Sequence, residues 1–169
     1  RICIETWKRL NQKHVVVMTS VGGKKSCIDN NLTATFLITT NESIFHNPLL
    51  TYLKRIMIGS VKAITSLKQD ILYSSSDQLP DILPALMMKI RNRKAQWIVR
   101  SYHAIPPARR VSHYAQRLSW TIMRLFSATI ITASSRMKSH LIAQGFLSQH
   151  IHIIVPGISR VKATTNLRA

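Results

Sequence analysis

Short apolar runs alternate along the chain with longer segments in which apolar residues recur at every third or fourth position. The short runs predict strands and the longer segments predict helices. The predicted strands cover residues 14–19, 32–40, 70–74, 97–101, 129–133 and 150–155, and the predicted helices cover residues 2–10, 48–64, 80–90, 106–126 and 136–144. Alternating strands and helices predict an α/β fold with a mainly parallel sheet flanked by helices.

The stretch from Asp70 to His103 predicts a strand, a loop, a helix and a second strand. Two strands joined by a helix of this length form a right-handed parallel crossover, so their carboxyl ends lie at one edge of the sheet. Ligands gather at that edge in open parallel sheets. Asp77 follows the first strand, and Ser101 and His103 end the second. We therefore expect a functional site to begin there.

The first predicted strand is followed by a glycine- and lysine-rich segment. Residues 14–19 are nearly all apolar, which is typical of a strand buried on both faces. The segment 22–25 suggests the phosphate-binding pattern GxxxxGK[ST], but Met18 stands where the first glycine is needed and Lys25 where the pattern has Ser or Thr. We therefore predict an exposed loop over 22–25, with phosphate binding as the disfavoured alternative.

The segment that begins at Asn47 and Pro48, an N-cap and first-turn pair, predicts a strongly amphipathic helix. One side carries the apolar residues Leu49, Leu50, Leu53, Ile56, Met57, Val61 and Ile64, and the basic residues Lys54, Arg55 and Lys62 lie elsewhere. The favoured interpretation is a helix whose apolar side covers the sheet. The alternative is an interfacial helix whose basic residues contact anionic lipid.

Composition indicates one domain with a large positive charge. The 169 residues include 24 Lys and Arg but 6 Asp and Glu, which gives a formal net charge of +18, and every acidic residue lies at or before Asp81. The apolar fraction of 46% is ordinary for a globular protein. This charge favours a phosphorylated metabolite, an acidic membrane surface or nucleic acid as partner, and charge alone does not choose among them.

Two cysteines, Cys3 and Cys27, do not make a disulfide framework, which favours a reduced, cytoplasmic setting. The histidines show no metal-ligand spacing with Cys or carboxylates, so we predict no metal site and no cofactor. The sequence also has no run of about 18 apolar residues that would predict a membrane span, and no signal peptide.

Several ordered motifs resemble the N-terminal domain of family-4 glycosyltransferases. Residues 128–135 form a strand ending in Ser, followed by a short helix, by Gln144-Gly145-Phe146 and by the run 152–158, which ends in a Pro-Gly-hydrophobic turn. The family has the same order of strand, helix, glycine, strand and turn. Residues 70–103 resemble its middle part, in which a strand after a proline-containing helix ends in a histidine.

This resemblance implies one half of a GT-B enzyme. Such enzymes have two Rossmann-like domains that face a cleft, use no metal and transfer a sugar from a nucleotide-sugar donor with retention of configuration, to a sugar, lipid or polysaccharide acceptor. Residues 1–159 would form the Rossmann-like domain on the acceptor side, and 160–169 a tail toward the second domain. His103 matches the cleft histidine, Ser134 the serine that ends the later strand, and Gly157 the glycine of the turn.

The chain departs from the family pattern in three places. Proline and serine stand at positions 156 and 159, where the family has Asn and Asp. The family's first strand and its glycine-rich loop have no counterpart here. That strand lies between the second and fourth strands, so its loss would leave unpaired backbone groups in mid-sheet. The donor-binding C-terminal domain has no counterpart either. We therefore expect a truncated product that transfers no sugar by itself.

Other interpretations of the candidate residues stay open. Asp77 suits either hydrogen bonding to an acceptor hydroxyl or a helix-entry cap. Arg109 and Arg110 suit either an acceptor phosphate or a solvated basic face. For the whole chain, the alternative function is a basic nucleic-acid-binding module, although no zinc finger, helix-turn-helix or aromatic-rich sheet motif is present, so nucleic acid is a disfavoured partner. A remnant without function is the third alternative.

Overall fold

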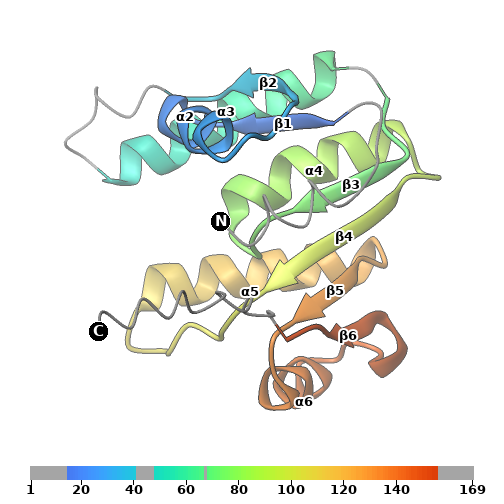
Figure 1. The fold of residues 1–169 in the computed structure, drawn as a ribbon. Coiled ribbons are helices and arrows are strands. Elements are labelled where there is room, and N and C mark those ends of the chain that lie inside the picture. The colour runs from blue at the N-terminus through green and yellow to red at the C-terminus, as the bar shows by residue number, and fades with distance from the viewer. Residues whose placement is uncertain (1–14, 41–47, 67, 156–169) are drawn as a thin grey trace, which may run out of the picture.

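The computed structural model describes residues 15–40, 48–66 and 68–155, and it confirms an α/β fold with Rossmann-like parallel sheets flanked by helices (Figure 1). The strands are β1 (Val16–Thr19), β2 (Thr35–Ile38), β3 (Ile71–Ser74), β4 (Gln96–Ser101), β5 (Thr129–Thr132) and β6 (Ile151–Ile153). The helices are α2 (Val21–Asp29), α3 (Pro48–Thr65), α4 (Leu79–Arg91), α5 (Arg110–Leu125), α6 (Ser135–Ala143) and a 3₁₀ turn (Ser148–His150). The helix predicted over residues 2–10 lies outside the described residues.

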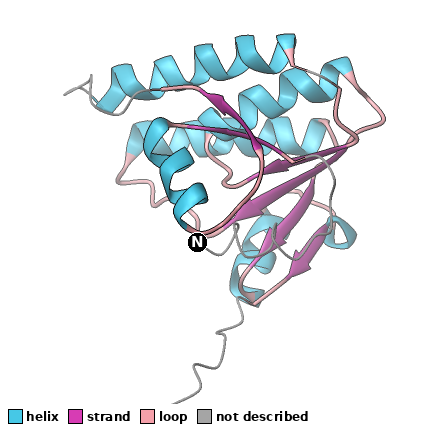
Figure 2. Ribbon diagram, turned by 45° about the horizontal axis from the view of Figure 1, so that its top comes forward, coloured by secondary structure: helices cyan, strands magenta, loops and turns pink. Residues whose placement is uncertain are grey.

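The described strands form two parallel sheets. β1 pairs with β2, and β3, β4, β5 and β6 pair in that order, so the strand order follows the chain in the larger sheet. The long helices α3, α4 and α5 lie together on one side of the strands, with the short α2 on the other (Figure 2). None of the described helices has the length and apolarity that a membrane span requires.

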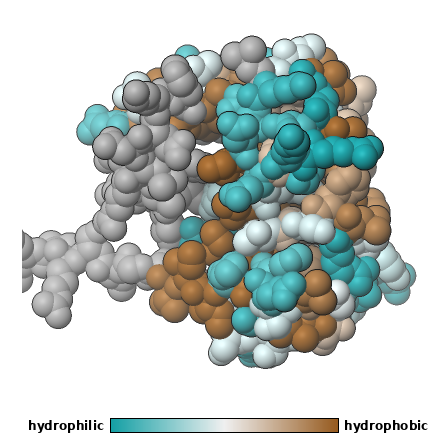
Figure 3. Space-filling view, turned by 90° about the vertical axis from the view of Figure 1, so that its right-hand side faces the viewer, coloured by the Kyte–Doolittle hydropathy of each residue, from teal (hydrophilic) through white to brown (hydrophobic). Residues whose placement is uncertain are grey.

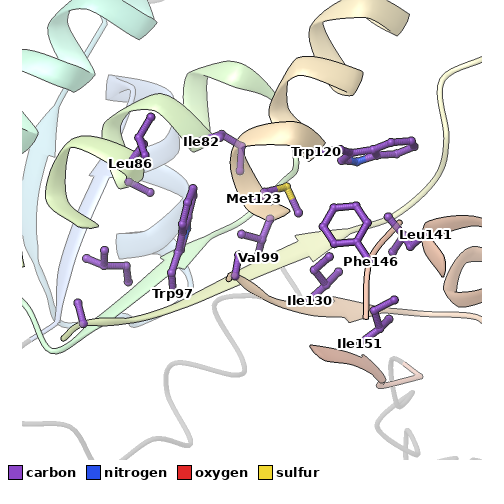
Figure 4. Close-up of a cluster of buried hydrophobic side chains, with 14 of the residues drawn as sticks. Ile82, Leu86, Trp97, Val99, Trp120, Met123, Ile130, Leu141, Phe146 and Ile151 are labelled. Carbon is purple, nitrogen blue, oxygen red and sulfur yellow. The ribbon is translucent and has the colours of Figure 1, made fainter. Parts of the chain in front are cut away.

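The main hydrophobic core lies between the larger sheet and the helices that cover it (Figure 4). β4 contributes Trp97 and Val99, and α5 contributes Trp120 and Met123. The core also contains Leu72, Ile82, Leu86, Ile130, Leu141, Phe146 and Ile151. Aromatic and branched side chains from four strands and three helices therefore fix how this half of the molecule packs.

The prediction of an exposed loop over 22–25 is wrong, because these residues form the first turns of α2. Ser20 is the N-cap, and its Oγ accepts a hydrogen bond from the Gly23 amide at 3.1 Å. A Cβ at position 23 would lie 2.1 Å from Thr19 Oγ1, so the glycine permits the helix to pack closely against the end of β1. Close packing and a cap here outweigh the low helix propensity of glycine.

The prediction that β1 is buried on both faces is also wrong. Its residues are half-buried rather than buried on both faces. The reason is the small sheet: within the described part of the chain, β1 is hydrogen-bonded to β2 alone, and the core cluster beside it contains Cys27 and Leu32.

The favoured interpretation of the helix after Pro48 is wrong about which side is buried. α3 packs through its small residues: Gly59 and Ala63 are buried, and a Cβ at Gly59 would lie 2.8 Å from Pro84 of α4. The apolar residues Leu49, Leu50, Leu53, Met57, Val61 and Ile64 are exposed instead. Because α3 packs closely through its small residues, its bulky apolar row faces outward. On the face of the molecule drawn in Figure 3, hydrophobic residues also lie at the surface among hydrophilic ones.

Candidate functional site

Five of the predicted site residues lie at or beyond the carboxyl ends of β3, β4 and β5. The register pairs Ser74 with Val99 and Ser101 with Thr132, so these three strands end at one edge of the sheet. Asp77 follows β3, His103 and Arg109 follow β4, and Ser134 follows β5. The sixth residue, Gly157, lies outside the described residues.

Asp77 and Ser101 are brought into direct contact, but both are buried. Asp77 is 3% exposed, and its Oδ2 accepts hydrogen bonds from Ser101 Oγ at 2.7 Å, Gln116 Nε2 at 3.0 Å and Trp120 Nε1 at 2.8 Å. One carboxylate oxygen thus joins the loop after β3, the end of β4 and the middle of α5. Its hydrogen bonds give Asp77 a positioning role beneath the edge of the sheet.

Gln116 carries this network to the loop that holds His103. Its Nε2 also donates to the carbonyl oxygen of His103 at 2.9 Å, and its Oε1 accepts from the amide of Ile105 at 2.7 Å. Both amide hydrogens and the amide oxygen are therefore used. His113 Nδ1 lies 2.8 Å from the carbonyl oxygen of Ile105 and holds the same loop. The backbone on either side of His103 is fixed while its imidazole is exposed.

Gln116 was not among the candidates from the sequence. It lies on the buried side of α5 with Ser119, Trp120 and Met123, so it has the spacing of a core position but the chemistry of a polar one. A buried side-chain amide on the core-facing side of a helix needs hydrogen-bond partners. A glutamine at a core position of the predicted helix was therefore the sequence signal that could have identified Gln116.

The serine that ends β3 and the two serines that follow it belong to a second network of hydrogen bonds. Ser75 Oγ and Ser76 Oγ donate to Asp81 Oδ2 at 2.9 and 2.8 Å, and Ser74 Oγ donates to the Asp81 carbonyl oxygen at 3.1 Å. Arg55 lies 4.0 Å from the other carboxylate oxygen of Asp81. These contacts fasten the loop to the first turn of α4. Burial raises the pKa of nearby Tyr52 above its ordinary value, and the Asp81 charge acts in the same direction.

The remaining candidates differ in what they can offer to a ligand. Ser134 is the N-cap of α6, with Oγ accepting from the amide of Met137 at 3.2 Å. Arg109 is exposed and stands just before α5. His103, Arg109 and Ser134 are exposed, but the Ser134 hydroxyl is already used as the cap of α6, and Asp77 and Ser101 are buried.

The described residues contain no cluster of His, Cys, Asp or Glu that could hold a metal ion. Two of the hollows on the described surface are not lined by His103: one is lined by Arg117, Trp120, Thr121, Arg124 and Gln144, and the other lies under the end of α5. The candidate site lies at the edge of the sheet where β3, β4 and β5 end. Hydrogen bonding by an imidazole and ion pairing by a guanidinium are the chemistry that it offers.

The fold and this edge define an α/β protein with Rossmann-like parallel sheets and a polar site at the carboxyl ends of its strands. Comparisons of the chain with protein-family models, with curated proteins and with solved structures found no match. A more specific assignment therefore has to rest on the residues themselves.

Proposed function

We propose that this chain is the acceptor-binding half of a retaining, nucleotide-sugar-dependent glycosyltransferase of the GT-B kind. The observation that carries the proposal is the placement of His103. A buried network of Asp77, Ser101 and Gln116 holds the backbone around His103, and the imidazole is exposed at the carboxyl edge of a parallel sheet. The ordered motifs that resemble the family-4 N-terminal domain support the same conclusion.

In this proposal His103 hydrogen-bonds to a hydroxyl of the acceptor or of the transferred sugar. A neutral imidazole has one donor and one acceptor nitrogen, which suits a sugar hydroxyl. Arg109, six residues further along the same loop, pairs with a phosphate of the acceptor. The nucleotide of the donor is bound by a second domain, so the present chain binds acceptor but does not transfer sugar by itself.

The test is a binding measurement on the full chain. The imidazole signals of His103 are followed by NMR while hexoses, hexose phosphates, UDP-glucose and GDP-mannose are added separately. We expect hexoses or hexose phosphates to shift the His103 signals and the backbone amide signals of the loop around it, and His103→Ala to abolish the amide shifts without lowering the melting temperature. His152→Ala is the matched control, because His152 is an exposed histidine on β6.

Two outcomes would overturn the proposal. One is a cooperatively folded chain whose His103 signals stay unchanged at millimolar concentrations of all these sugars. The other is sugar binding that His152→Ala weakens as much as His103→Ala does.

A further inference from the structure

The outer side of α5 exposes a row of apolar residues that the candidate site does not use. This apolar ridge consists of Val111, Tyr114, Leu118 and Leu125, whose exposed fractions range from 52% to 77%. The ridge lies opposite the buried row of the same helix, which includes Gln116 and Met123. α5 thus carries large apolar residues on both sides, and packing within the described molecule accounts for those on the buried side.

An arginine row borders the ridge. Arg110, Arg117 and Arg124 are spaced seven residues apart, about two helical turns, so they share one side of α5. All three are exposed, and none forms an ion pair with a described carboxylate. Arg117 and Arg124 also line the hollow between α5 and α6, where Arg124 Nη1 donates to the carbonyl oxygen of Gln144 at 2.8 Å. The row offers positive charge directly beside apolar surface.

α3 provides a useful contrast, because it also has an exposed apolar row. Its cations, however, are engaged within the chain. Lys62 Nζ donates to the carbonyl oxygen of Ile38 in β2, and Arg55 faces the Asp81 carboxylate. Lys62 and Arg55 therefore have partners within the chain, as Arg124 of α5 has, whereas Arg110 and Arg117 of α5 have no hydrogen bond or ion pair among the described residues.

We infer that the apolar ridge of α5 docks on an anionic lipid bilayer, with the arginine row against lipid phosphates. A helix that lies in the membrane interface needs apolar residues on the contacting side and basic residues at its border, which α5 has. A second copy of the chain is a poor partner, because each copy carries a net charge of +18. Nucleic acid would pair with the arginines but leave the outermost, apolar row in water.

The ridge also bears on the acceptor, and this step rests on the proposed function. α5 begins directly after the loop that carries His103 and Arg109. A chain docked through α5 would hold that loop close to the headgroups. The acceptor is then a lipid-linked sugar or a lipid headgroup rather than a freely diffusing sugar.

The experiment is co-flotation of the full chain with vesicles of phosphatidylcholine, with or without 30% phosphatidylglycerol, in low and high salt. We expect binding to the anionic vesicles in low salt and release in high salt, because salt screens surface attraction. Arg110→Gln with Arg117→Gln should weaken binding roughly thirtyfold, since each basic residue near an anionic surface contributes roughly a fivefold factor in affinity. Leu118→Ser with Leu125→Ser should weaken it roughly tenfold or more.

The matched control is Met57→Ser with Val61→Ser on α3, which should bind as the parent chain does. Circular dichroism checks that each variant folds, and all substituted residues are exposed or half-exposed. Equal binding to neutral and anionic vesicles, loss of binding in the α3 control alone, or binding to an oligonucleotide without binding to vesicles would overturn the inference. Vesicle binding is measured without sugar, so its failure is distinguishable from a failure of the His103 experiment.

Discussion

In the four-stranded sheet at least every second residue of β3, β4 and β5 is buried, whereas the residues of β1 are all half-exposed. Helices α4, α5 and α6 supply a continuous core to the larger sheet. The smaller sheet has a buried cluster of Cys27 and Leu32 with a few half-buried neighbours. Yet the sequences of the small strands, VVMT and TFLI, are as apolar as those of the large ones.

This difference shows that apolar composition alone does not determine burial. Parallel strands are usually covered on both faces and flanked by further strands. β1 lies between β2 and the larger sheet, and the described strands divide there into two sheets (Figure 1). We expect the smaller sheet to open more readily than the larger one, and the predictions below test that contrast.

The largest expected effect is at Asp77. Asp77→Ala would leave three buried donors, from Ser101, Gln116 and Trp120, without their acceptor. Each unsatisfied buried group costs about 1–3 kcal/mol, so we expect the free energy of unfolding to fall by about 3–5 kcal/mol in urea titrations. Asp77→Asn keeps one acceptor oxygen and should cost less than half as much. A loss below about 1 kcal/mol for Asp77→Ala would contradict the positioning role.

A matched pair of isoleucines compares the two sheets directly. Ile130 of β5 is 0% exposed, and Ile38 of β2 is half-buried. Ile130→Ala removes fully buried methyl groups and leaves a cavity, so we expect a loss of about 2–5 kcal/mol. Ile38→Ala should cost about 1 kcal/mol, because part of that side chain is already in water. Equal losses in urea titrations would show that the sheets unfold as one equally packed unit.

Two buried hydroxyl groups should produce smaller effects, one in each half. Thr40 Oγ1, after β2, and Thr132 Oγ1, in β5, have no hydrogen-bond partner among the described residues. Valine has the same shape without the hydroxyl, so Thr40→Val and Thr132→Val should change the free energy of unfolding by less than about 1 kcal/mol, toward stabilisation. Destabilisation by more than that amount in thermal unfolding would indicate that the hydroxyl has a partner, such as a buried water molecule.

The sequence predicted most of the elements, because apolar spacing distinguishes strands from helices directly. Residues 70–74 and 129–133, for example, were predicted as strands and form β3 and β5 within one residue. α2 was missed because two glycines argue against a helix, while the close approach to Thr19 that favours them depends on tertiary packing. The exposed row of α3 was missed for a related reason: periodicity finds two sides of a helix but does not reveal which one packs.

The site was predictable as an edge of the sheet but not as a network. Chain order placed Asp77, Ser101 and His103 at the ends of adjacent strands. That Asp77 bonds to Ser101 depends on the loop after β3 turning inward. The hydrogen bond from Gln116 to Asp77 depends on how α5 is rotated about its axis. Neither quantity is expressed in local sequence periodicity.

The smallest and most local effect concerns Cys27, the buried thiol of the smaller half. Burial raises the pKa of this thiol above its ordinary value. The neutral, buried thiol stabilises the fold fully at pH values below the pKa of an unfolded cysteine, about 8.5. This stabilisation is lost as the pH rises through the higher pKa of the folded state. Cys27→Ala should remove this decline from urea titrations between neutral and alkaline pH.

The same thiol reports whether the smaller sheet opens alone. In a Cys3→Ser, Trp7→Phe background, thiol labelling follows Cys27 while tryptophan fluorescence follows Trp97 and Trp120, both buried in the larger core. We expect labelling in low urea, before the fluorescence changes, because a small cluster opens at lower free energy than a large core. If labelling instead coincides with the fluorescence transition at every urea concentration, the two sheets unfold as one cooperative unit. The half-exposed strands β1 and β2 would then owe their stability to α3, which packs on α4.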